Sequence, residues 1–216
     1  MLSEHDITAL FERLRALNPD RHTVPDKVQP IPFESLVAVM LSAQSRDENT
    51  AKAAAQLFAV ARTPQAILAL PQNEIAALIK PCGLYNMKSR NVHAMCRALL
   101  DRFNGEVPGT RAELMSLPGV GRKSADILER FVFGRPRVAV DTHVHRVCNR
   151  TGLATGKTEA QTAASLEPRV PSAFAMDAHV WLLELGKRWC KPRRPRCSLC
   201  PVGQICERNG VVSGSA

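Results

Sequence analysis

The chain has 216 residues, of which 45% are hydrophobic, so it can bury one sizeable core or two small ones. Its 29 Lys and Arg residues outnumber its 20 Asp and Glu residues, and the formal net charge of +9 favours a polyanionic partner. No apolar run approaches the roughly 18 residues that a membrane span needs, so we expect no membrane-spanning segment.

The seven cysteines do not suggest a disulfide framework. Seven is an odd number, and Cys82, Cys96 and Cys148 lie in apolar helical patterns. The first six residues are polar and acidic and do not resemble a secretory signal. We therefore expect reduced thiols and a cytoplasmic protein.

Helical signals dominate the chain. Capping residues recur ahead of apolar runs, and the one strand-like run, Val138 to Val140, is too short to define a sheet. The expected helix starts are Ser45-x-x-Glu48, Thr63-Pro64, Thr110-x-x-Glu113 and Thr158-x-x-Gln161. The apolar residues at helical spacing are Val92, Cys96, Leu99 and Phe103, and later Ala178, Trp181, Leu182, Leu185 and Trp189. These patterns predict an all-α protein of about ten short helices, estimated from the caps and periods.

A helix–turn–helix segment is predicted between residues 110 and 133. The turn is Leu117-Pro-Gly-Val-Gly121, and Arg122 and Lys123 open the second helix. Gly119 and Gly121 can take positive φ and hold no side chain between the backbone and a ligand. Their amides, with those of the helix N-terminus, can bind a DNA phosphate without reading sequence. An ordinary hairpin with a glycine turn is the alternative; the flanking leucine and bases favour phosphate binding.

Lys123 is the candidate nucleophile. The positive end of the helix dipole disfavours its ammonium form and so makes the amine more nucleophilic. A phosphate contact is the alternative role. Its candidate partner is Asp141, which ends the apolar run before a helical pattern and can serve as an N-cap. A capped carboxylate stays ionised, which suits stabilisation of a positively charged sugar transition state.

The last 27 residues contain four cysteines with the spacing Cys-x6-Cys-x2-Cys-x5-Cys. Thiolates at Cys190, Cys197, Cys200 and Cys206 can hold zinc or a four-iron four-sulfur cluster. Only one close pair is present where zinc sites usually have two, which favours iron–sulfur, with disulfides third. Seven of the 22 residues from 187 to 208 are basic and one is acidic, as expected of a DNA-binding patch or a solvated basic tail.

The motifs together resemble the bacterial endonuclease III family, the bifunctional DNA glycosylases and abasic-site lyases of the helix-hairpin-helix superfamily. The resemblance runs from about residue 33 to residue 206. It rests on Leu41-Ser-Ala-Gln44, Gly83-Leu-Tyr-Asn86, Leu117-Pro-Gly-Val-Gly-Arg-Lys123, Val140-Asp-Thr-His143, Arg146-Val-Cys-Asn-Arg150 and the four cysteines.

The resemblance implies two helical domains: a six-helix barrel at 26–134, with the helix-hairpin-helix at about 110–133, and an iron–sulfur domain made of 1–25 and 135–216. It implies one four-iron four-sulfur cluster per chain and a monomer that acts on duplex DNA containing oxidised pyrimidines or abasic sites, in the nucleoid. The DNA would lie between the two domains. The damaged base would be flipped out, and Lys123 would form a Schiff base that permits β-elimination.

The resemblance also implies DNA contacts at Gln44, Leu84 and His143, beside the hairpin residues Leu117, Gly119, Gly121 and Arg122. Each of the first three has another reading: Gln44 as a helix-end cap, Leu84 as a core residue and His143 as a satisfied polar side chain. Two residues depart from the family pattern: Arg46 stands in place of a small polar residue and Asp126 in place of an asparagine. An ion pair of Asp126 with Lys123 would favour the ammonium form and slow catalysis.

Two other functions stay open. The chain could be a non-catalytic helix-hairpin-helix module with a merely structural cluster. It could also be an adenine-type monofunctional glycosylase of the same fold. Lys123 argues against the second, because the adenine-specific enzymes lack a lysine at the hairpin position and carry a further C-terminal domain.

Overall fold

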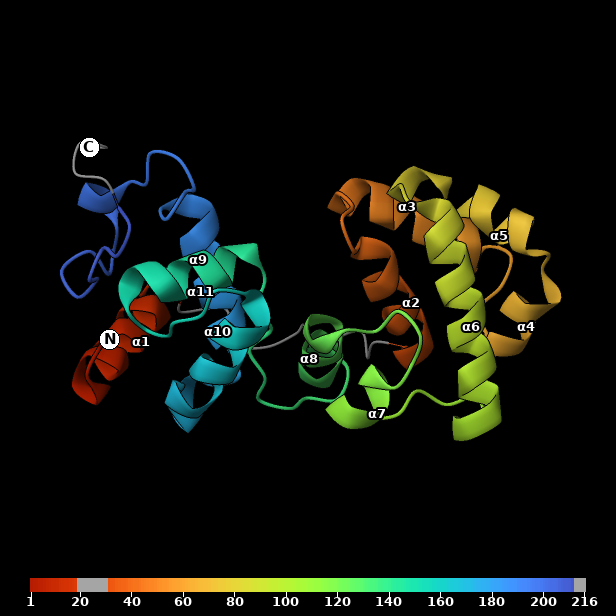
Figure 1. Cartoon of the computed structure of the whole chain (residues 1–216), viewed down its shortest axis with the longest axis horizontal. Coiled ribbons are helices and arrows are strands. Elements are labelled where there is room, and N and C mark those ends of the chain that lie inside the picture. Colours follow the sequence, from red (N-terminus) through yellow and green to blue (C-terminus); the bar gives the residue numbers. More distant parts are fainter. Residues whose placement is uncertain (19–30, 212–216) are drawn as a thin grey trace. The chain divides into compact units, whose positions relative to one another are not determined.

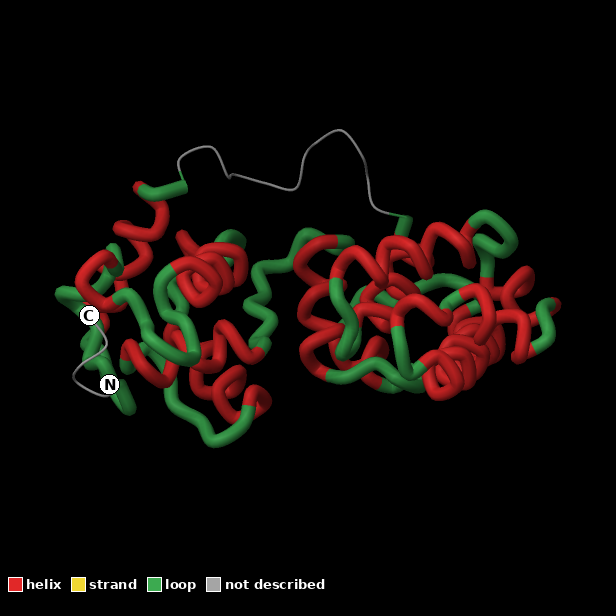
Figure 2. The backbone as a smooth tube through the Cα atoms, turned by 90° about the horizontal axis from the view of Figure 1, so that it is seen from above, coloured by secondary structure: helices red, strands yellow, loops and turns green. Residues whose placement is uncertain are grey.

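A computed structural model describes residues 1–18 and 31–211, and in these ranges every regular element is a helix (Figure 2). The all-α prediction is confirmed. No helix in the described ranges is long and apolar enough to cross a membrane. The α-helices are α1 (Glu4–Ala16), α2 (Pro32–Ser42), α3 (Asp47–Phe58), α4 (Pro64–Ala69), α5 (Gln72–Leu78), α6 (Tyr85–Phe103), α7 (Arg111–Met115), α8 (Arg122–Phe131), α9 (Thr142–Thr151), α10 (Glu159–Leu166) and α11 (Ala178–Arg188). The 3₁₀ turns are η1 (Lys80–Cys82), η2 (Glu167–Arg169), η3 (Ser172–Phe174) and η4 (Cys197–Leu199).

The chain divides into two compact units, each with its own core. One unit is Lys27–Gly134, which we call the hairpin unit; the other, the cysteine unit, combines Met1–Asp26 with Arg135–Ala216. The cysteine unit therefore joins the two ends of the chain, and Figure 1 shows α1 (red) beside the helices of the C-terminal segment. The domain boundary expected between residues 25 and 26 lies outside the described residues.

The hairpin unit packs around α2 and α6. Val92, Cys96 and Leu99, which the spacing placed on one face of a helix, are fully buried along α6. This helix contacts α2, α4 and α5, and α2 also contacts α3 and α8 (Figure 1). The helix of the predicted hairpin that carries Lys123 is thereby packed on the centre of its unit.

The cysteine unit packs around α9 and α11. Ala178, Trp181, Leu182 and Leu185 of α11 are buried, as their period predicts. The N-terminal helix closes this core, because Phe11 stacks on Phe174 with ring centroids 5.5 Å apart. The last turn of α11 leads directly into the segment with the four cysteines.

Three of the four predicted helix starts are confirmed. The hydroxyls of Thr63, Thr110 and Thr158 each accept a bond from the backbone N–H three residues later. The start expected at Ser45 is wrong: α3 has Arg46 at its N-cap, without a side-chain bond. The Ser45 hydroxyl instead donates to the Arg46 carbonyl at 3.3 Å, so it does not face the helix amides.

Candidate functional site

The turn of the hairpin depends on a close approach at Gly119. This residue has φ +79°, and a Cβ built on it would lie 2.9 Å from Met40 Cε and 3.0 Å from Asn91 Cβ. A side chain is therefore excluded twice, by the left-handed backbone and by the helices α2 and α6 beneath it. The turn is consequently seated on the core of its unit.

Gly121 has a different task. Its φ is −92°, so it does not use the positive φ that glycine permits, and no atom lies within 4 Å of a Cβ built on it. It is the N-cap of α8 and has no side chain to bond the first-turn amides. These N–H groups, with the helix dipole, can therefore receive an anion that approaches the bare backbone.

The other hairpin residues separate into exposed and buried ones. Lys123 is exposed in the first turn of α8, and Arg122 is partly exposed beside it. Leu117 is 2% exposed and belongs to the core. A DNA contact through the Leu117 side chain is therefore not available, and only its backbone could take part.

Asp126 braces the hairpin. Its carboxylate is 1% exposed and accepts a bond from Arg111 Nε at 2.6 Å, while Arg122 Nε lies 3.6 Å from its other oxygen. Arg111 thus ties α7 to α8. The ion pair considered between Asp126 and Lys123 does not fit this arrangement, because the carboxylate is buried against Arg111 whereas Lys123 is exposed.

Gln44 and Leu84 are both exposed and both strained. Their φ angles are +53° and +50°, the left-handed region that non-glycine residues rarely occupy. Gln44 caps neither neighbouring helix, since the caps are Ala43 and Arg46. Leu84 is 50% exposed, so the alternative of a core residue is wrong. Strained exposed residues of this kind cluster at ligand sites.

Asp141 lies in the cysteine unit as the N-cap of α9. Its Oδ1 accepts both cap bonds, from His143 N at 2.9 Å and from Val144 N at 2.8 Å. The predicted cap is confirmed, and Oδ2 takes no part in it. The carboxylate is partly exposed. The two N–H bonds to Oδ1 fix the direction of the carboxylate.

His143 is held by its neighbours on α9 and α11. Its Nδ1 lies 3.2 Å from Arg146 Nη2, which also donates to the Gly186 carbonyl at 3.0 Å. The Nε of Arg146 donates to the Cys190 carbonyl at 2.7 Å. One arginine therefore links His143 to the start of the cysteine segment, and this favours the reading of His143 as a well-satisfied polar residue.

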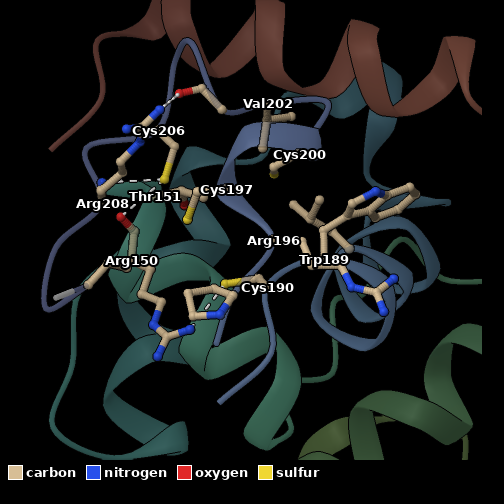
Figure 3. A pocket seen from close by; sticks show the side chains of 14 residues that line it. Arg150, Thr151, Trp189, Cys190, Arg196, Cys197, Cys200, Val202, Cys206 and Arg208 are labelled. Carbon is tan, nitrogen blue, oxygen red and sulfur yellow. Dashed lines mark hydrogen bonds between the residues drawn. The ribbon is translucent and has the colours of Figure 1, made fainter. Parts of the chain in front are cut away.

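The four predicted ligand cysteines line one pocket (Figure 3). Cys190, Cys197, Cys200 and Cys206 surround about 380 Å³ of empty space, part of it open to solvent. All seven cysteines of the chain are free thiols. Burial, followed by the negative charges of the other three cysteines, raises the pKa of Cys200 to about 11.

The four thiols are not grouped as a single metal ion would need. Among the described residues, no three His, Cys, Asp or Glu side chains stand close enough together to hold a single ion. A zinc ion with bonds to sulfur of about 2.3 Å would need the sulfurs to be nearly in contact. Four thiols set further apart than a single ion allows match the wider ligand spacing of a four-iron four-sulfur cluster.

Two arginines, Arg150 of α9 and Arg208 of the basic patch at 187–208, bond backbone carbonyls of the cysteine segment. Arg150 donates to the carbonyls of Lys191 at 2.6 Å and Pro192 at 2.9 Å, and Arg208 donates to the Gly203 carbonyl at 3.3 Å. These bonds hold the loops around the cysteines. The exposed bases of this segment are Lys187, Arg188, Lys191, Arg193, Arg194, Arg196 and Arg208.

One residue of interest, Lys88, was missed in the sequence. It is 3% exposed and donates from Nζ to the carbonyls of Leu41 at 2.8 Å and Cys82 at 3.0 Å. A signal was available: Lys88 lies four residues before Val92, on the apolar stripe of α6. A charged residue at a core position of a helical period indicates a specific partner.

The chain resembles known proteins over nearly its whole length. Residues 37–172 match the family described as HhH-GPD superfamily base excision DNA repair protein. Endonuclease III of Escherichia coli K12 is 46% identical over 198 residues, covering 92% of this chain and 93% of that protein. Endonuclease III of Haemophilus influenzae is 44% identical with the same coverage. A structure of a trapped endonuclease III–DNA covalent intermediate matches with a TM-score of 0.86 at 37% identity, covering 96% of this chain and 97% of that one.

The chain therefore belongs to the HhH-GPD superfamily of base excision DNA repair proteins. Within that superfamily its relatives are endonuclease III enzymes, which makes it a base excision repair DNA glycosylase/lyase with DNA as its partner. Lys123, Gln44 and Leu84 lie in the hairpin unit, whereas Asp141, His143 and the four pocket cysteines lie in the cysteine unit.

We expect Asp126→Ala to lower the free energy of unfolding by roughly 3 kcal/mol, at the low end for a broken buried ion pair because its arginine partners reach water. Asp126→Asn should cost less, since its oxygen can still accept from Arg111. Urea unfolding measures both. Asp101→Ala, an exposed acid on α6, is the control and should change the value by no more than about 0.5 kcal/mol. Equal urea midpoints for Asp126→Ala, Asp126→Asn and Asp101→Ala would show that the buried pair of Asp126 with Arg111 does not stabilise the fold.

Proposed function

We propose that this protein removes oxidised pyrimidines from duplex DNA and cleaves the resulting abasic site by β-elimination, acting as a monomer in the nucleoid. The observation that carries the proposal is Lys123: an exposed primary amine in the first turn of α8, next to an N-terminus whose amides no side chain caps. Uncapped helix N-termini bind phosphates, so an amine at this place would lie beside the DNA backbone and its sugars.

In the proposed reaction the neutral amine of Lys123 attacks C1′ of the flipped nucleotide. The glycosidic bond breaks, its electron pair leaves with the base, and the base takes up a proton. The sugar ring opens to a Schiff base between Nζ and C1′. Loss of a proton from C2′ then expels the 3′ phosphate, and water hydrolyses the imine to release the enzyme.

Asp141 is proposed to stabilise the positive charge that develops on the sugar. Both cap bonds go to Oδ1, so the carboxylate is oriented before substrate binds, and its Oδ2 is available to the sugar. Preorganised charge of this kind costs no rearrangement in the transition state. This role assigns Asp141 to electrostatic stabilisation rather than to proton abstraction.

Gln44 and Leu84 are proposed to fill the space that the flipped base leaves in the duplex. Both side chains are exposed on left-handed backbone at the ends of short loops. An amide can bond the unpaired opposite base, and an apolar side chain can replace the lost stacking. The pair would therefore lower the cost of extruding the nucleotide.

The four cysteines are proposed to hold one four-iron four-sulfur cluster per chain. Cys190, Cys197, Cys200 and Cys206 supply the soft anionic ligands that iron–sulfur clusters need, and all four line one pocket. When bound, the cluster cross-links the last segment of the chain. Arg150 and Arg208 hold the same loops through backbone carbonyls, so the exposed bases of this segment would be presented to DNA on an ordered surface.

We expect Lys123→Gln to abolish borohydride trapping and strand cleavage on abasic DNA, because only an amine can form a Schiff base. Binding to an abasic analogue should weaken modestly, with the salt slope reduced by about one phosphate contact. Lys52→Gln, an exposed lysine on α3, is the control and should trap like the wild type. Trapping by Lys123→Gln would place the nucleophile elsewhere. A wild-type protein that never traps would favour a non-catalytic module or a monofunctional glycosylase.

Asp141→Asn separates the cap from the charge. Asn caps helices about as well as Asp, so thermal unfolding should hardly change. Base excision should fall on the order of a hundredfold or more, the scale for loss of a preorganised electrostatic group. Single-turnover excision beside a melting curve measures both. Full activity would reduce Asp141 to a cap.

Removal of one ligand should release the cluster. The wild-type protein should be yellow-brown and contain about four iron atoms per chain. We expect Cys200→Ser to lose this iron and colour, and to weaken DNA binding because the basic loops lose their cross-link. Cys148→Ala, which removes a buried cysteine outside the pocket, is the control and should keep its iron. A colourless wild-type protein with one zinc per chain would contradict the assignment.

A further inference from the structure

Lys88 bonds the ends of two helical segments, α2 and η1, that are distant in sequence. Its ammonium group is buried in the first turn of α6 and donates to the carbonyl of Leu41, near the end of α2, and to that of Cys82, the last residue of η1. Leu41 precedes Gln44 by three residues, and Cys82 precedes Leu84 by two. One amine therefore bonds the chain just before each of the two exposed left-handed residues.

The buried charge of Lys88 costs free energy that its two hydrogen bonds must offset. Burial of an ammonium group is unfavourable, and the N-terminus of α6 repels a cation. The offset comes from its acceptors: Leu41 carries one of the last carbonyls of α2, which a helix leaves unpaired and which attract a cation. A methionine would fill the same space without a buried charge to offset. The presence of a lysine is therefore explained by the two segments that its hydrogen bonds hold in place.

The segments that Lys88 ties are strained. Gln44 and Leu84 both have positive φ, and between Cys82 and Leu84 lies Gly83 at φ +68° and ψ 166°, a conformation that essentially only glycine adopts. Strained backbone of this kind persists only where its surroundings over-determine it. The bonds of Lys88 to both preceding carbonyls are such a constraint.

We propose that Lys88 is a positioning residue for damage recognition: its ammonium group locks Gln44 and Leu84 as one rigid pair. The inference rests on the proposed function, in which this pair fills the gap left by the flipped base. The same corner of the unit seats the phosphate-binding turn, because Gly119 packs on Met40 of α2 and Asn91 of α6. Lys88 thereby also fixes the spacing between the gap-filling pair and the phosphate site.

The test compares two duplexes of the same sequence, one of which lacks a base at a single position. Affinity is measured for a duplex with an abasic analogue and for the same duplex undamaged, in which the pair has nothing to fill. Lys88→Met should weaken binding to the abasic duplex by about ten- to a hundredfold, the scale for loss of charged hydrogen bonds. Binding to the undamaged duplex and its salt slope should stay at the wild-type values, because the phosphate contacts remain.

Matched variants decide the mechanism. Leu84→Ala combined with Gln44→Ala should show the same selective loss, and adding Lys88→Met to that double variant should cause no further loss, since the residues act as a unit. Gly83→Ala should reproduce the effect through the backbone alone, because φ is unsuitable although space for a Cβ is open. If Lys88→Met does not fold, Lys88→Gln, which can still donate to one carbonyl, carries the test with an intermediate loss.

An equal loss on both duplexes would show a merely structural lysine and overturn the inference, as would unchanged affinity for the abasic duplex. Failure of the proposed function gives a different result: a wild-type protein that does not prefer the abasic duplex, or Lys123→Gln that still traps. The two failures are therefore distinguished in the same set of measurements.

Discussion

The close approach of Gly119 to Met40 and Asn91 is the contact on which the hairpin unit depends. It seats the turn on α2 and α6 with no room for a Cβ, and the buried pair of Asp126 with Arg111 then sets α7 against α8. A phosphate-binding turn must hold its amides still before the ligand arrives, since ordering them on binding would cost entropy. The packing of Gly119 on α2 and α6 and the pair of Asp126 with Arg111 both supply that rigidity through residues outside the turn.

The cysteine unit achieves order by other means. Its last segment has one short 3₁₀ turn, η4, and depends on arginines that bond backbone carbonyls: Arg146 to Cys190, and Arg150 to Lys191 and Pro192. Loop carbonyls without helical partners need donors. Arg146 and Arg150 therefore hold the loop that surrounds the proposed cluster.

Local patterns predicted the fold well because helix periods and caps are short-range signals. The spacing of Val92, Cys96 and Leu99, and the caps at Thr63 and Thr110, follow from residues within one turn of each other. Apart from the helix start missed at Ser45, the failures involve tertiary partners. The burial of Asp126 against Arg111, of Leu117 in the core and of Lys88 between two loops is decided by segments that spacing alone does not bring together. The roles of the site residues stay predictions for the same reason.

Two lysines occupy comparable positions in this unit and have opposite surroundings. Lys88 and Lys123 both lie in the first turn of a helix, where the dipole disfavours a cation. At Lys88 the ends of α2 and η1 supply two carbonyls and the side chain is buried, so its nitrogen is engaged and cannot reach DNA. At Lys123 the side chain is exposed on a helix without an N-cap side chain. The environment, rather than the residue type, is thus what supports the proposed positioning role of Lys88 and the proposed nucleophilic role of Lys123.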